Sequence, residues 1–141
     1  MEERRRALRR TAEVQVKALL AAALLGVAFP GIACELPAGG YFVDSPRYSL
    51  SYRTQPARIT VGEHFALDFS ICGKDGRPLP SAVVVDAWMP AHKHGMNYKA
   101  EVKSYGGGRF YATGLMFHMP GLWQFLFDVD GERITETIPI E

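Results

Sequence analysis

In Glu63-His-Phe-Ala-Leu-Asp-Phe-Ser-Ile-Cys72, apolar and polar side chains alternate along the chain. Phe65, Leu67, Phe69 and Ile71 fall on one side of an extended segment, and the residues between them fall on the other. This period of two predicts a β-strand with one buried face.

The same pattern recurs on both sides of this strand. Period-two runs cover residues 48–53, 57–61, 82–89, 98–104, 109–117, 122–130 and 132–140. Turn sequences separate several of them, namely Asp75-Gly76, Gly106-Gly107-Gly108, Pro120-Gly121 and Asp130-Gly131. No long helical pattern follows residue 33. About seven short antiparallel strands in residues 34–141 predict an all-β fold, an immunoglobulin-like sandwich in one domain.

Composition and charge argue against a disordered, a collagen-like and a nucleic-acid-binding protein. The chain has 141 residues, of which 48% are hydrophobic and 22% charged, and its formal net charge is +1. These values are typical of a globular protein. Residues 34–141 hold 10 basic and 12 acidic residues, so this part has no basic surface suited to nucleic acid.

Residues 1–33 have the features of an export signal peptide. Five arginines and one lysine precede or border a 12-residue apolar run at 18–29, and Gly31 and Ala33 supply the small residues that signal peptidase needs. Cleavage is expected between Ala33 and Cys34, which places residues 34–141 in the periplasm or outside the cell. An uncleaved membrane anchor is the alternative.

Both cysteines, Cys34 and Cys72, lie in the exported part. An even number of cysteines in an oxidising compartment favours a disulfide. A lipid attached to Cys34 after cleavage is the competing interpretation, because residues before it resemble a weak lipobox.

The first cluster of chemically distinctive side chains is His92, His94 and Met96, which occupy alternate positions. In a fully extended segment the first and the last would be about 13 Å apart, too far to share an ion. Gly95 can take a positive φ and fold the segment back, so that two imidazoles and a thioether meet.

The second cluster is Met116, His118 and Met119, at the end of another predicted strand. Strand ends gather at one edge of a sandwich, so His118 and Met119 are expected to join the first cluster. Imidazole and thioether donors without a carboxylate suit copper, and thioether favours Cu(I). Zinc is less suitable. A blue-copper site would need a cysteine, and Cys72 is expected to be paired.

Other interpretations apply to single residues. Met89 continues an apolar alternation and is expected in the core, as are Trp123, Phe125 and Phe127, whereas His64 is expected to face solvent. A solvated loop without metal is the alternative for the histidine cluster. The sequence has no Gly-x-Ser-x-Gly, Walker or dinucleotide motif, so an enzyme finds little support, and oxidative copper chemistry is the one enzymatic alternative left open.

Two stretches resemble the YtkA-like family, which shares similarity with proteins of the FixH type. They are VDAWMPAHKHGMNY and GGGRFYATGLMFHMPGLWQFLFDV, at residues 85–98 and 106–129. The family motif Met-Pro-x-His-x-His-Gly-Met matches Met89, Pro90, His92, His94, Gly95 and Met96, and Met-Pro-Gly-x-Trp matches Met119, Pro120, Gly121 and Trp123. The resemblance implies an immunoglobulin-like sandwich in an exported or membrane-associated accessory protein of metal or respiratory systems.

The sequence therefore predicts an exported module that binds one copper ion, as Cu(I) or Cu(II), through His92, His94, Met96, His118 and Met119. A periplasmic or membrane cuproprotein is its expected partner. The alternative is a metal-free interaction domain that docks onto a membrane or respiratory complex. The oligomeric state and the direction of copper transfer stay open.

Overall fold

The computed structural model describes residues 34–36 and 39–141. The predicted export signal at 1–33 lies outside the described residues. In the described part the chain forms nine strands and no helix, and therefore no helix able to span a membrane. The strands are β1 (Tyr41–Asp44), β2 (Tyr48–Gln55), β3 (His64–Gly73), β4 (Val84–Met89), β5 (His94–Gly95), β6 (Glu101–Gly106), β7 (Arg109–Met116), β8 (Gly121–Val129) and β9 (Glu132–Ile140).

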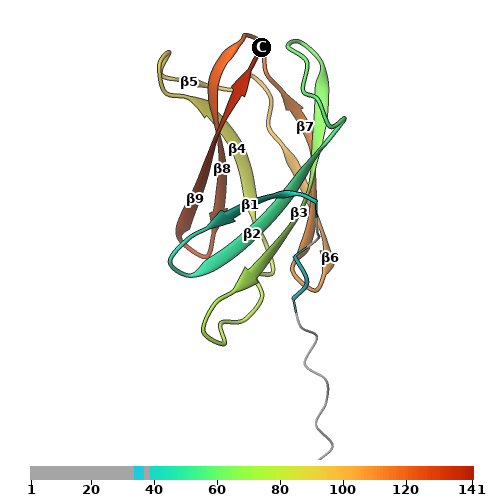
Figure 1. The fold of residues 1–141 in the computed structure, drawn as a ribbon, viewed down its shortest axis with the longest axis vertical. Coiled ribbons are helices and arrows are strands. Elements are labelled where there is room, and N and C mark those ends of the chain that lie inside the picture. The colour runs from blue at the N-terminus through green and yellow to red at the C-terminus, as the bar shows by residue number, and fades with distance from the viewer. Residues whose placement is uncertain (1–33, 37–38) are drawn as a thin grey trace, which may run out of the picture. The chain divides into compact units, whose positions relative to one another are not determined.

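The strands form two sheets that pack face to face (Figure 1). One sheet has the order β1-β2-β3-β7-β6 and the other the order β5-β4-β8-β9, with every neighbouring pair antiparallel. The predicted all-β sandwich is confirmed.

The core lies between the sheets and consists of the inward residues of the predicted alternation. Phe65, Leu67, Phe69 and Ile71 of β3 are all buried. They face the aromatic residues of β8, whose Phe127 ring centre lies 5.3 Å from that of Phe69. Each such side chain stabilises the fold by about 1.5–3 kcal/mol when it is fully buried. The period of two in the sequence therefore reports the packing of the sandwich.

Two details differ from the sequence prediction. Residues 57–61 are not a strand but part of the connection between β2 and β3. Pro56 and Gly62 bound this segment, and Ile59 and Val61 still pack against the core, which explains the apolar alternation without strand pairing. Conversely, the sequence does not predict β1 and β5, because strands of four and two residues are too short to show an alternation of apolar and polar side chains.

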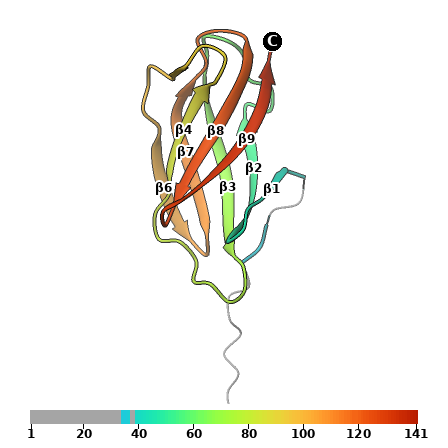
Figure 2. The same ribbon diagram turned by 90° about the vertical axis from the view of Figure 1, so that its left-hand side faces the viewer.

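The connections place different residues at the two ends of the sandwich (Figures 1 and 2). β5, the end of β7 and the C-terminus lie at the upper end in the view of Figure 1. The β8–β9 turn and the segment around Cys34 lie toward the lower end. His64 and Cys72 lie near opposite ends of β3, and Met116 pairs with His64, so the second cluster and the cysteines are at opposite ends of the sandwich.

Candidate metal centre

A tight hairpin between β4 and β5 carries His92 and His94. The backbone N–H groups of His92 and Lys93 both donate to the carbonyl of Met89, at 3.2 and 2.9 Å. Met89 and His94 then face each other across the two strands. The turn at Pro90 to Lys93 reverses the chain immediately before His94.

The residue that makes this reversal is Lys93, and the prediction that Gly95 does so is wrong. Lys93 has a φ of 55°, whereas Gly95 is not among the residues with positive φ. Gly95 lies within β5 opposite Trp88, where a Cβ would come 3.1 Å from the carbonyl oxygen of Ala87. Its role is to allow close approach of the backbones, since β4 and β5 must pair for His94 to lie at this edge.

The second segment, which carries His118 and Met119, follows β7 and is held in place by Trp123 of β8. The indole Nε1–H of Trp123 donates to the carbonyl of Met119 at 3.0 Å. Gly121, with a φ of 133°, packs so tightly that a Cβ there would be 2.9 Å from the terminal methyl of Met89. The motif Met-Pro-Gly-x-Trp thus fixes the position of Met119, and of His118 before it, through this hydrogen bond and the close packing of Gly121.

The structure brings the imidazoles of the two segments together. The ring centres of His94 and His118 are 4.9 Å apart, and those of His92 and His94 are 5.8 Å apart. Both His94 and His118 also contact the buried indole of Trp123, at 5.7 and 5.4 Å. Two loops that are distant in sequence therefore present three neighbouring histidines at one end of the sandwich.

The ring separations fit a shared ion. A metal lies about 2 Å from a ligating ring nitrogen and so about 3.1 Å from the ring centre, which puts two rings on one ion about 4.5 to 6.3 Å apart. Both measured separations lie in this range. Within residues 34–36 and 39–141, no three His, Cys, Asp or Glu side chains already have their donor atoms in a coordinating arrangement. The rings must therefore turn about their side-chain bonds to bind an ion together.

Exposure leaves these donors open to an incoming ion. His92 and His118 are exposed, and His94 is half-buried. The Nδ1 atom of His94 lies 3.1 Å from the carbonyl oxygen of Gly95. When this nitrogen carries the proton of the neutral ring, Nε2 retains its lone pair as a metal donor, as in many metal sites where a carbonyl fixes the tautomer.

The two predicted thioether donors follow the histidines in the chain and lie beside the core. Met96 and Met119 are half-buried and pack against the hydrophobic core. The backbone N–H of Met96 donates to the carbonyl of Ala87 at 3.3 Å, which keeps Met96 beside the end of β4. We refer to His92, His94, Met96, His118 and Met119 as the His–Met cluster.

Met89, Met116 and His64 lie near the three histidines in sequence or strand pairing, and the structure places each of them. Met89 is only 1% exposed, as predicted for a core residue. Met116 is half-buried and pairs across the strands with His64, which is exposed as predicted but also contacts the ring of Tyr98 at 5.2 Å. Sequence reasoning placed Trp123 in the core but missed its support of the histidine rings. The sequence feature that could have indicated this support is the position of Trp123 only four residues after Met119.

A disulfide joins Cys34 and Cys72, as predicted, with Cα atoms 5.6 Å apart. A lipid on Cys34 would need the same sulfur and is incompatible with this bond. The disulfide fastens the segment before β1 to the C-terminal part of β3. Ser70, on the face of β3 opposite its four apolar core residues, is also fully buried.

These features define an antiparallel β-sandwich with histidines and methionines gathered at one end. The sequence model of the YtkA-like family matches residues 49–127, more than half of the chain. The protein belongs to the YtkA-like family, as its motifs indicated. No curated protein matches the sequence.

Proposed function

We propose that this protein is an exported copper-binding protein that holds one copper ion in the His–Met cluster. The observation that supports this best is the row of three imidazoles, with ring centres 4.9 and 5.8 Å apart, assembled from two loops. Met96 and Met119, both half-buried, follow His94 and His118 closely in the chain. Among first-row metals this donor set suits copper, because thioether sulfur is a soft ligand, and suits zinc less well.

The expected role follows from the openness of the site. An ion held by exposed histidines can be taken up from, and passed to, another protein without unfolding of the sandwich. We therefore propose that the protein captures or hands over copper in the periplasm, with a periplasmic or membrane cuproprotein as its partner. The sequence of residues 1–33 supports export.

A competition titration of the purified protein with Cu(I), and separately with Cu(II), tests this proposal. Replacing His94 or His118 with alanine should weaken binding by more than about 10- to 100-fold, since even loss of a group that only supports a ligand has an effect of that size. His64→Ala is the matched control and should leave affinity unchanged. Unchanged affinity in both cluster variants would exclude the site.

A second candidate function is supported by the outer face of the four-stranded sheet. Trp88 and Leu122 are 38% and 58% exposed there, and Trp88 lies opposite Gly95 of β5. These side chains could contact a protein partner without any metal. If the wild-type protein binds copper no better than His92→Ala/His94→Ala, this docking function replaces the copper proposal.

The hairpin geometry predicts a large effect for one substitution of Lys93 and almost none for another. Lys93→Pro removes the N–H that bonds to Met89 and forces φ to about −65°, so it should open the hairpin and lower copper affinity by about tenfold or more. Lys93→Gly accepts a φ of 55° and should leave affinity within about twofold of wild type. Both remove the same charge, so equal effects in the titration would contradict the geometric explanation.

A further inference from the structure

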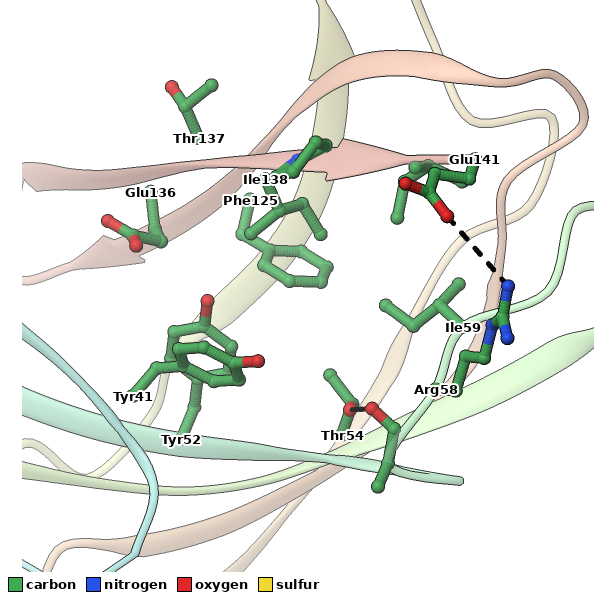
Figure 3. A pocket seen from close by; sticks show the side chains of 13 residues that line it. Tyr41, Tyr52, Thr54, Arg58, Ile59, Phe125, Glu136, Thr137, Ile138 and Glu141 are labelled. Carbon is green, nitrogen blue, oxygen red and sulfur yellow. Dashed lines mark hydrogen bonds and ion pairs between the residues drawn. The ribbon is translucent and has the colours of Figure 1, made fainter.

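A cavity of about 330 Å³ lies at the edge of the sandwich, apart from the His–Met cluster (Figure 3). Residues of β1 and β2 line one side and residues of β9 the other, and no residue of the cluster contributes. In Figure 3 the stacked rings of Tyr41 and Tyr52 lie on the side opposite Ile59 and Arg58. The volume is at the lower end of the range for small-molecule sites.

One wall of the cavity carries a carboxylate where the sequence pattern calls for an apolar residue. Ile134, Ile138 and Ile140 lie on the inner side of β9, and Glu136 shares their alternation and pairs with Phe125 of β8. Among the described residues, no Lys, Arg or His forms an ion pair with Glu136. The nearby Arg58 instead pairs with Glu141 at the exposed rim, at 3.9 Å.

The opposite wall carries a buried hydroxyl without a partner. Tyr52 is 1% exposed, and within the described part of the chain its hydroxyl oxygen has no hydrogen-bond partner. Burial raises the pKa of Tyr52, and the charge of Glu136 and the hydroxyl of Tyr41 raise it further. Because buried polar groups in proteins are almost always hydrogen-bonded, this hydroxyl would gain a partner from a bound molecule, which reaches the covered oxygen once the side chains around it shift slightly.

We infer that this cavity binds a small organic cation, an ammonium group attached to a short apolar body. The N–H groups would donate to the Glu136 carboxylate and to the Tyr52 hydroxyl oxygen, since neither acceptor has a partner within residues 34–36 and 39–141. The aromatic rings add attraction for a cation, and Ile59 and Ile138 provide contact for the apolar part. An anionic ligand is disfavoured by Glu136, and a neutral one leaves its charge unpaired.

Calorimetric titration of the whole protein with phenethylamine, 2-phenylethanol and phenylacetate tests this inference. The three probes share one body and differ in charge. We expect saturable binding of the amine, at least about tenfold tighter than of the alcohol, and no binding of the carboxylate, because a hydrogen bond to a charged group changes affinity by about 10- to 100-fold. No binding of the amine at millimolar concentration, or equal binding of all three probes, would overturn the inference.

Two conservative variants locate the site. Glu136→Gln keeps the side-chain shape and should weaken amine binding by about tenfold or more, and Tyr52→Phe should weaken it by about threefold to tenfold. Glu101→Gln, on exposed β6, is the control and should bind like wild type. Circular dichroism and copper titration of each variant report folding separately. Unchanged amine affinity in folded Glu136→Gln would assign the inward carboxylate to protection of the sheet edge and end the proposal.

Discussion

Replacing Trp123 with alanine should destabilise the protein by about 3–5 kcal/mol, the usual cost of truncating a large buried aromatic residue. Trp123 is fully buried, and its ring stacks on Phe117 with centres 4.5 Å apart. Its indole N–H also holds the carbonyl of Met119. Copper affinity should therefore fall together with stability, because His94 and His118 lose the indole ring that they contact edge-to-face. Chemical denaturation followed by circular dichroism gives the first quantity and competition titration gives the second.

A comparison with Trp123→Phe separates the two roles of this residue. Phenylalanine keeps most of the apolar packing and loses the hydrogen bond to Met119, so stability should fall by about 1 kcal/mol plus the cost of the missing volume. The copper affinity of Trp123→Phe should lie between that of the wild type and that of Trp123→Ala. Full copper affinity in folded Trp123→Ala would show that the loops position the histidines without the indole.

Loss of the disulfide should reduce stability without affecting copper. The bond joins Cys34 to Cys72 across a separation of 38 residues, and closing a loop of this size stabilises a protein by about 3–4 kcal/mol in the loop-entropy treatment. The double variant Cys34→Ser/Cys72→Ser should lose about that amount in denaturant unfolding. Its copper affinity should stay within about twofold of wild type, since His64 and Cys72 mark opposite ends of β3 and the His–Met cluster lies at the His64 end.

The double variant also checks whether the cysteines contribute to metal binding. Removing both sulfurs leaves no thiolate, so copper that still binds must use the imidazoles and thioethers. A large loss of copper affinity with the fold intact would place the cysteines in the site and contradict the account.

The fold was predictable because strand alternation is a local property. In β3, Phe65 to Ile71 alternate with polar residues, and the same residues are buried in the structure. The segment 57–61 shows the limit of this reasoning, because Ile59 and Val61 reach the core from a loop. A pattern of burial reports which side chains are covered but does not report whether the backbone pairs.

The proximity of the three histidines was predictable from the sequence, whereas the turn that brings them together was not. The spacing of His92 and His94 and the second cluster at His118 indicated a common end of the sandwich, and the ring contacts place them there. The sequence could not show that Lys93 makes the turn, because a lysine at positive φ is unusual and is imposed by the surrounding hairpin. The cavity lined by Tyr52 and Glu136 depends on contacts between distant strands, and the local sequence marks it only by a carboxylate at an otherwise apolar position of β9.

The most direct test of the central claim is X-ray absorption at the copper edge for the protein loaded with one equivalent of Cu(I). We predict imidazole scattering together with sulfur at about 2.3 Å, and the loss of one imidazole in His118→Ala. Met96→Leu/Met119→Leu should lose the sulfur contribution. A spectrum without imidazole scattering, or one identical in wild type and His118→Ala, would contradict the proposal that two loops of this sandwich share one copper ion.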